Sequence, residues 1–388
     1  MAVYDEDPKQ PAQYENAYQL RDVIATELRL HCVKRGKILI IIQNDFSEIL
    51  IPSSNMGRRY SILLPCLWAC ALGDKTKRKT APNDQGKNMS DAKFDVKTVL
   101  PNLRCTLGEG PHWDAKDGML YWVDIVGKTA YALRPSDGGS RSWTFDQPVA
   151  AIVPRENDGL LVALADGLAF LDAESGETTP FVAPDSDHAG NRSNESRVDP
   201  MGRFWHGTMQ NNIGPNGEDL PVTVSTGTLN RVTADGDVTR FESYVGISNT
   251  LLWSADGTKM FFGDTIKNTL NVYDFDMKTG VPSNPREFFG PQDRGNMDGS
   301  AMDADGYIWN ARWGGGCLIR FNPSGAVDRI IELPVTQPTS CVFGGPDMKT
   351  LYITSAAVGL EDNGNPLEGA LLSIQTDVAG QPCTRFGG

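Results

Sequence analysis

The sequence lacks the features by which several classes of protein are recognised. Its 388 residues include only seven cysteines and four histidines, and no two cysteines have the CxxC spacing of a zinc-binding pair. The odd number of cysteines argues against a disulfide scaffold and favours a reducing compartment, which predicts a cytoplasmic protein. No apolar run approaches the roughly 18 residues that a membrane-spanning helix needs, so we expect no membrane partner.

Positive charge is scarce in most of the chain. The sequence carries 36 Lys and Arg against 49 Asp and Glu, a net charge of -13. Residues 1–88 hold 13 basic and 10 acidic side chains, a net of +3, so residues 89–388 have a net charge of -16. A surface this acidic repels phosphates, and nucleic acid is therefore excluded as a main partner.

The first 88 residues share no pattern with the rest of the chain. A possible helix over residues 18–30 is followed by a β-like run over residues 38–42 and a basic stretch over residues 75–79. We predict that residues 1–88 form an N-terminal extension of low order, or are upstream sequence translated from a wrongly assigned start. A small accessory domain is the alternative. The second predicted domain covers residues 89–388.

A short motif recurs six times from Met89 onward. Each copy is a turn with Asp or Asn, usually followed by Gly, and then a short strand of aromatic and β-branched residues. The copies are anchored at Gly118, Gly159, Gly202, Gly257, Gly306 and Asp347, which gives steps of 41, 43, 55, 49 and 41 residues. Each step is long enough for four short strands, and helical periodicity is nearly absent.

Six all-β units of this length predict a six-bladed β-propeller. A β-sandwich is the competing fold, but it does not explain the regular period. Radial closure also leaves few exposed strand edges. In a propeller the inner strands of all blades converge on one axial channel, so polar residues from distant parts of the sequence can meet there.

Three polar residues interrupt apolar runs at nearly the same place in their units. Glu109, Asn249 and Asp298 precede their anchors by nine, eight and eight residues. For each residue alone a turn or capping role is the simpler explanation, but the shared offset favours a joint role. Two carboxylates and an amide oxygen suit Ca²⁺, Mg²⁺ or Mn²⁺, and Zn²⁺ or Fe²⁺ also accept such a set. We therefore predict one divalent metal ion in the central channel.

A second polar group precedes the third anchor. Asn194 lies eight residues before Gly202, and Arg192 lies two residues earlier, which places both on one face of an extended segment. The fork of donors on a buried arginine suits a hydroxylated or carboxylated ligand. A solvated loop with an ion pair is the alternative interpretation.

These motifs together resemble the gluconolactonase, regucalcin and senescence-marker-protein family of sugar lactonases. The likeness runs from about residue 95 to residue 384. It is especially similar to the bacterial pentonolactone hydrolases, in which the fifth blade also reads Trp-Gly-Gly, as at residues 313–315 here. The matching segments are residues 107–113, 192–200, 202–209, 246–249, 297–300, 305–309 and 343–352.

The resemblance implies roles for individual residues. Glu109, Asn249 and Asp298 match the metal ligands of the family, and Asp298 also matches its proposed general base. Arg192 and Asn194 match its substrate-contacting pair.

Two departures from the family pattern affect what can be carried over. The family reads Asn-Asp-Gly where this chain reads Asn194-Glu195-Ser196. Some relatives carry a glutamate soon after Gly-Thr-Met, whereas Gln210 follows that motif here. The sugar preference of those relatives therefore does not transfer to this chain.

The predicted function is metal-dependent hydrolysis of a sugar lactone to the open aldonic acid. The substrate is an aldonolactone, such as L-arabinonolactone or gluconolactone, and the enzyme class is a hydrolase acting on carboxylic esters. Either Asp298 or a hydroxide formed on the metal serves as the base. The predicted protein is a monomer or a weak homo-oligomer. Two alternatives are a propeller that hydrolyses organophosphates and a calcium-binding regulatory protein without catalysis.

Overall fold

A computed structural model describes residues 28–33, 37–42, 49–52, 94–360 and 363–388. The chain divides into two compact units, Met1–Asp84 and Gln85–Gly388. In the first unit a three-stranded antiparallel sheet has the order β1-β2-β3, with strands β1 (Leu28–Val33), β2 (Lys37–Ile42) and β3 (Ile49–Pro52).

The predictions for the extension are tested only in part. Residues 38–42 lie in β2, as their β-like composition predicts, whereas residues 28–30 lie in β1 and not in a helix. The predicted boundary at residue 88 falls outside the described residues, as does most of the segment predicted to have low order.

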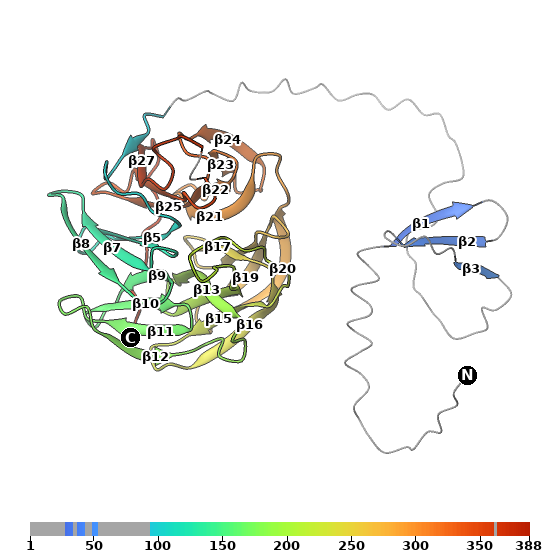
Figure 1. Cartoon of the computed structure of the whole chain (residues 1–388), viewed down its shortest axis with the longest axis horizontal. Coiled ribbons are helices and arrows are strands. Elements are labelled where there is room, and N and C mark those ends of the chain that lie inside the picture. Colours follow the sequence, from blue (N-terminus) through green and yellow to red (C-terminus); the bar gives the residue numbers. More distant parts are fainter. Residues whose placement is uncertain (1–27, 34–36, 43–48, 53–93, 361–362) are drawn as a thin grey trace, which may run out of the picture. The chain divides into compact units, whose positions relative to one another are not determined.

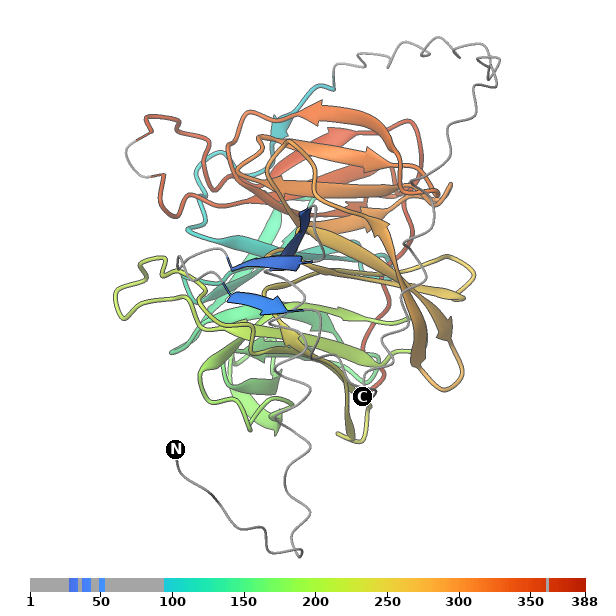
Figure 2. The same cartoon turned by 90° about the vertical axis from the view of Figure 1, so that its right-hand side faces the viewer.

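The second unit is a six-bladed β-propeller, which confirms the predicted all-β fold. Six four-stranded antiparallel sheets follow one another around a central axis, from teal to red in Figure 1. Figure 2 shows the twist within the individual sheets. The described residues contain no helix, and therefore none that could cross a membrane.

Blades one to three follow the chain in order, and within each the first strand is the innermost. Blade one consists of β5 (Gly108–Asp114), β6 (Met119–Asp124), β7 (Thr129–Arg134) and β8 (Gly139–Thr144). Blade two consists of β9 (Val149–Pro154), β10 (Leu160–Leu164), β11 (Gly167–Leu171) and β12 (Thr178–Val182). Blade three consists of β13 (Asn191–Val198), β14 (Phe204–Gln210), β15 (Gly227–Val232) and β16 (Val238–Val245).

Blades four and five repeat this arrangement, and blade six closes the ring. Blade four consists of β17 (Ser248–Trp253), β18 (Lys259–Asp264), β19 (Thr269–Asp276) and β20 (Val281–Phe289). Blade five consists of β21 (Asn296–Met302), β22 (Ile308–Trp313), β23 (Cys317–Phe321) and β24 (Val327–Glu332). Blade six consists of β25 (Pro338–Gly344), β26 (Thr350–Ser355), β27 (Leu372–Gln375) and β4 (Lys97–Thr98).

The outer strand of blade six comes from the other end of the propeller sequence. Thr98 pairs with Leu372, and the Val99 amide donates to the Leu371 carbonyl at 2.9 Å. The ring is therefore closed by backbone hydrogen bonds between its first and last segments. This strand was not predicted from the sequence.

The six sequence anchors all lie in the turn between the first and second strands of their blades. Five of them are glycines with φ between 64° and 80°, a left-handed conformation that glycine adopts without steric cost. In blade six Met348, directly after the anchor Asp347, takes this conformation with φ 56°. The repeated Asp-Gly pairs thus mark one turn that every blade needs.

Six apolar clusters fill the gaps between neighbouring blades. Each cluster combines side chains from two adjacent sheets, as where Trp205 of blade three packs with Trp253 of blade four, ring centroids 5.9 Å apart. Burial of these faces stabilises the ring of sheets. The innermost strands β5, β9, β13, β17, β21 and β25 each contact the next around the axis. Polar residues on these strands are therefore brought together.

Candidate metal and substrate site

The structure brings all five predicted site residues to one cavity. This cavity has a volume of about 350 Å³ and lies at the N-terminal ends of the inner strands. Its lining includes Glu109 of β5, Arg192 and Asn194 of β13, Asn249 of β17 and Asp298 of β21, none of them more than 8% exposed. Residues up to 189 positions apart in the sequence, Glu109 and Asp298, thus face the same space.

Each of these inner strands is interrupted by a β-bulge at the site residue. A bulge adds an unpaired residue to one strand and redirects its side chains. The pairing of the inner strand with its neighbour shifts between Glu109 and His112, Ser193 and Ser196, Asn249 and Leu251, and Met297 and Ser300. The nearly equal offsets seen in the sequence therefore correspond to one irregularity repeated in these four blades.

At Glu109 the bulge depends on the glycine that follows. Gly110 has φ 57°, and a β-carbon there would lie 2.9 Å from the Ala150 carbonyl oxygen. The Gly110 amide donates to Glu109 Oε2 at 2.9 Å, which holds the carboxylate against its own backbone. The Glu-Gly pair therefore fixes the direction of this side chain.

The amide of Asn249 is oriented by a neighbouring hydroxyl. Asn249 Nδ2 donates to Thr265 Oγ1 at 2.8 Å, and Thr265 Oγ1 in turn donates to the Met297 carbonyl at 2.8 Å. With its nitrogen fixed in this way, Asn249 presents its oxygen on the other side, where Asn194 Nδ2 lies at 3.3 Å. Asn249 can therefore offer an oxygen ligand.

The next residue, Thr250, has a strained backbone. Its φ of 43° is uncommon for a β-branched residue. Its hydroxyl donates to the Asp298 carbonyl and lies 2.7 Å from Ser300 Oγ. These contacts tie the bulge of blade four to the backbone of the site residue in blade five.

Asp298 and Glu109 are two buried carboxyl groups that need a compensating charge. Burial, followed by repulsion from Glu195, raises the pKa of Glu109 to about 8. Burial, followed by repulsion from Glu109 and Glu195, raises the pKa of Asp298 well above its usual range. Asp298 Oδ1 is also buried without a hydrogen-bond partner among the described residues. A proton or a cation must therefore balance this pair.

The available oxygens fit a divalent cation. Two carboxylates and one amide oxygen are the hard ligands that Ca²⁺, Mg²⁺ and Mn²⁺ prefer. Asp298 Oδ1 has no hydrogen-bond partner among the described residues, so its lone pairs are free to bind such an ion. Glu109, Asn249 and Asp298 are accordingly the residues that could hold it.

Arg192 and Asn194 lie together beside the carboxylates. Arg192 Nη1 donates to Asn194 Oδ1 at 2.7 Å, and Asn194 Nδ2 donates to the Ser248 carbonyl at 2.8 Å. Burial lowers the pKa of Arg192 to about 10, which leaves the guanidinium charged at neutral pH. Both side chains are held in place and line the cavity, as the sequence predicts.

A loop that covers one side of the cavity was not predicted from the sequence. Residues 211–226 join β14 to β15, and Asn212, Asp219 and Leu220 from this loop line the cavity. The step of 55 residues between Gly202 and Gly257, the longest of the five, was the available indication of an insertion.

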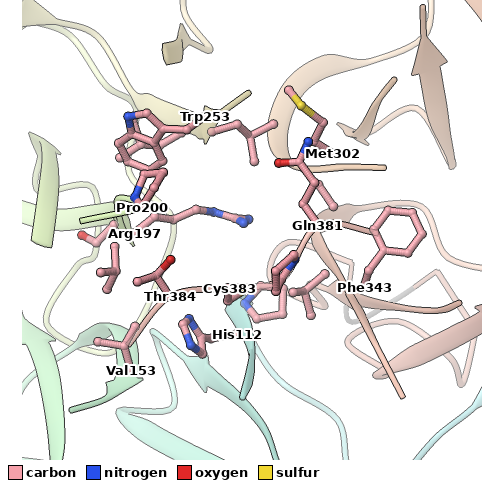
Figure 3. A pocket seen from close by; sticks show the side chains of 18 of the residues that line it. His112, Val153, Arg197, Pro200, Trp253, Met302, Phe343, Gln381, Cys383 and Thr384 are labelled. Atoms are coloured by element: carbon pink, nitrogen blue, oxygen red, sulfur yellow. The ribbon is translucent and has the colours of Figure 1, made fainter. Parts of the chain in front are cut away.

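A second cavity of about 250 Å³ lies at the C-terminal ends of the same inner strands (Figure 3). His112 and Arg197 reach it from the strands, while Cys383 and Thr384 reach it from the C-terminal segment. Arg197 Nε donates to Glu195 at 2.8 Å, so its charge is already paired. Among the described residues no carboxylate lines this cavity, which makes the first cavity the candidate metal site.

One buried serine and histidine pair needs comparison with a nucleophilic dyad. Ser193 Oγ lies 2.6 Å from His206 Nε2, but the hydroxyl donates to the Leu164 carbonyl. Burial lowers the pKa of His206 to about 4, so the ring is neutral. A hydroxyl whose proton is directed to a carbonyl is not activated by the histidine, so this pair does not supply a nucleophile.

An acidic cluster outside the cavity is already neutralised by the protein. Asp185, Asp187 and His188 bring their ligand atoms within 4.8 Å of one another. Arg240 Nη2 lies 3.0 Å from Asp185 and 2.6 Å from Asp187, and His188 Nδ1 lies 2.9 Å from Asp185. The guanidinium occupies the place that a cation would take.

Comparisons with known proteins all indicate the same family. Residues 107–357 match the SMP-30/Gluconolactonase/LRE-like region. The chain is 34% identical to L-arabinolactonase of Azospirillum brasilense, over 75% of this chain and 95% of that protein. It is 35% identical to 6-deoxy-6-sulfogluconolactonase of Pseudomonas putida, over 73% of this chain and 95% of that protein.

The solved structures agree with this result. The crystal structure of a calcium-binding protein, regucalcin, from Agrobacterium tumefaciens superposes with a TM-score of 0.70 at 31% identity. The match covers 76% of this chain and 98% of that one. The resemblance predicted from the sequence motifs is therefore confirmed.

Proposed function

The chain belongs to the SMP-30/gluconolactonase/LRE-like family, and on this basis we propose that it is a metal-dependent hydrolase of sugar lactones. The substrate is an aldonolactone, a pentono- or hexono-1,4-lactone such as L-arabinonolactone or gluconolactone. The product is the open aldonic acid.

One observation carries the proposal. Two buried carboxylates and an oriented amide oxygen line the same cavity, and one carboxylate oxygen has no partner among the described residues. Burial of such groups costs free energy unless a cation or a ligand pairs with them. A fold that keeps this arrangement is therefore built to hold something there.

We assign Glu109, Asn249 and Asp298 as ligands of one divalent cation. Such a cation, when bound, supplies a Lewis acid that polarises the lactone carbonyl and stabilises the charge that develops on its oxygen. The relative with a solved structure is named as a calcium-binding protein. We keep Ca²⁺, Mg²⁺, Mn²⁺, Zn²⁺ and Fe²⁺ as candidates.

Asp298 is the proposed general base. It takes a proton from the water that attacks the lactone carbonyl, and the ring carbon-oxygen bond then breaks to leave a hydroxyl group and a carboxylic acid, which ionises in solution and releases the proton that the assay follows. The proton returns to the ring oxygen as this bond breaks. As a ligand Asp298 binds the cation through one oxygen, so the base role requires its other oxygen to stay free of the cation.

Arg192 and Asn194 are the proposed substrate-binding residues. Both are held by neighbouring polar groups, so little conformational freedom is lost when a lactone binds. Their donors and acceptors suit ring hydroxyl groups. In this position they orient the lactone carbonyl toward Asp298.

The test is metal-dependent lactone hydrolysis by the full chain. The protein is treated with a chelator and given back Ca²⁺, Mg²⁺, Mn²⁺, Zn²⁺ or Fe²⁺ singly, and acid release is followed from arabinono-, xylono-, galactono- and gluconolactone. We expect activity to return with at least one ion. Asp298→Asn should lower kcat by about 100-fold or more, because it removes the base.

The matched control is Asp235→Asn, an equal change of charge on an exposed turn outside the cavity. A phosphotriester is assayed on the same preparation. A folded protein that binds metal but hydrolyses no lactone would refute the proposal. Phosphotriester turnover in such a protein would favour the organophosphate hydrolase, and its absence the calcium-binding protein.

A further inference from the structure

The loop of residues 211–226 is an insertion held over the candidate site (yellow-green in Figure 2). In blade four the corresponding connection covers only residues 265–268. The loop folds back on itself, since the Gly214 amide donates to the Glu218 carbonyl and the Leu220 amide to the Asn212 carbonyl, at 2.9 and 2.8 Å. It therefore presents Glu218 and Asp219 in a defined place on the cavity wall.

Negative charge dominates the lining of this cavity. Its ionisable side chains are Arg192 and four carboxyl groups, those of Glu109, Glu218, Asp219 and Asp298. The two buried carboxylates are balanced when a divalent cation binds. Glu218, which accepts from the Asn216 amide within its loop, and Asp219, which acts on Arg192, are both exposed to solvent. Together they carry one more charge than Arg192 offsets, so the cavity keeps an excess of negative charge.

The single guanidinium is also largely engaged. Arg192 Nε and Nη2 both donate to Asn212 Oδ1, at 3.0 and 2.8 Å, and Nη1 donates to the Ser193 carbonyl and to Asn194 Oδ1. Asn212 Nδ2 in turn donates to Asp219 Oδ1 at 2.9 Å. An anionic group on a substrate would find little donor capacity and would meet the carboxylate of Asp219 directly behind the amide.

We infer that this loop makes the cavity selective for lactones that carry only hydroxyl groups, and that Asp219 is its main specificity-determining residue. Asp219 disfavours lactones with a phosphate or sulfonate substituent by charge repulsion, and it accepts hydrogen bonds from neutral hydroxyl groups. This inference rests on the proposed lactonase function. It deepens that function, since it sets the charge class of the substrate.

The test compares two substrates that differ at one position, where a neutral hydroxyl group in one is a charged phosphate ester in the other. Steady-state kcat/KM is measured for gluconolactone and 6-phosphogluconolactone, with the wild-type full chain, Asp219→Asn and Asp219→Ala. The wild type should prefer the neutral lactone. Asp219→Asn should raise the ratio of phosphorylated to neutral kcat/KM by about three- to tenfold at low salt, and less at high salt, as expected for screened charges.

The two substitutions separate charge from positioning. Asn at position 219 keeps an oxygen that accepts from Asn212 Nδ2, so its effect reports the charge. Ala removes that acceptor as well, so the KM for the neutral lactone should also rise. Asp235→Asn is the matched control and should leave the ratio unchanged.

The outcomes distinguish this inference from the proposed function. If the wild type hydrolyses both substrates equally well, or if Asp219→Asn leaves the ratio where it was, the selectivity inference is wrong while the lactonase function stands. If the wild type hydrolyses neither lactone with any of the ions, the lactonase function is wrong and the inference falls with it.

Discussion

The nitrogen of the Asn249 amide is held by the hydroxyl of Thr265. Thr265 accepts from Asn249 Nδ2 and donates to the Met297 carbonyl, so it fixes which atom of the amide faces the cavity. Groups that orient a metal ligand from behind typically contribute 10- to 100-fold in metal affinity. Thr265→Val keeps the shape of the side chain and removes both hydrogen bonds. We expect it to weaken metal binding by about tenfold or more, measured by calorimetric titration.

Thr269→Val is the control for this experiment. Its hydroxyl also donates to a backbone carbonyl, that of Lys267, in the same blade, but it does not line the cavity. Equal affinities for the two variants would show that Asn249 does not depend on Thr265 or is not a ligand.

The buried carboxyl pair predicts an unusual pH dependence for the metal-free protein. The pKa of Glu109 is about 8 in the folded chain, against a usual value of 4.5, and that of Asp298 is also raised. Between pH 4.5 and about pH 8, Glu109 is protonated in the folded state and ionised in the unfolded state. The folded state therefore binds more protons, and the free energy of unfolding falls as pH rises. His112 and His206, with pKa values lowered to about 3 and 4, act in the opposite sense below about pH 6.5.

The carboxyl pair therefore dominates the change in stability between pH 6.5 and pH 8, above the range in which the two histidines act. In chelator, the Tm should fall across this window, and Glu109→Gln should reduce the slope. Saturating metal should remove the fall, because the cation replaces the protons. A Tm that rises with pH in chelator would contradict the prediction.

For single residues, the sequence predicts which side chains lie together in the cavity but not which hydrogen bonds orient them. Glu109, Asn249 and Asp298 could be selected because they share an offset from a repeated turn. Thr265 and Asn212 carry no such regularity, since they lie in connections whose lengths differ between blades. Their roles depend on the direction of single hydrogen bonds, which the order of residues does not specify.

The elements of the propeller differ in how clearly the sequence marks them. The first turn of each blade requires a left-handed residue, so Asp-Gly pairs recur and five of the six anchors are glycines. β4 has only two residues and no alternation of polar and apolar side chains, and it was missed. The C-terminal segment forms no strand beyond β27, so no periodic pattern distinguishes it from a tail.

That C-terminal segment is nevertheless an integral part of the core. Phe386 is fully buried between blades two and three, with ring centroids 6.0 Å from Phe181 and 6.4 Å from Phe204. Its amide donates to the Pro154 carbonyl at 2.9 Å. Phe386→Ala should therefore lower the free energy of unfolding by about 3–5 kcal/mol, measured by urea denaturation.

The exposed Met201→Ala provides the comparison, since Met201 is 57% exposed and its truncation should cost little. Similar unfolding free energies for the two variants would show that the C-terminal segment does not pack in the core.

For the molecule as a whole, closure of the ring depends on the first and last segments of the propeller, because both contribute strands to blade six. Leu372 and Ser373 of β27 pair with β4, and Phe94 packs against Trp309 with ring centroids 6.2 Å apart. Val96 joins the same apolar cluster between blades five and six. The residues just before blade one thus belong to the last blade, and their pairing with β27 closes the propeller.

Two shortened chains test this closure and the predicted domain boundary together. A chain that begins at Met89 keeps Phe94, Val96 and β4, and it should retain the unfolding free energy of the propeller and its lactone hydrolysis. A chain that begins at Val99 loses all three, and it should be less stable by about 2–4 kcal/mol in urea denaturation, from the lost apolar burial and strand pairing. Equal stability of the two chains would mean that β4 does not close the ring. A loss already present in the chain that begins at Met89 would instead place the start of the catalytic unit within residues 1–88.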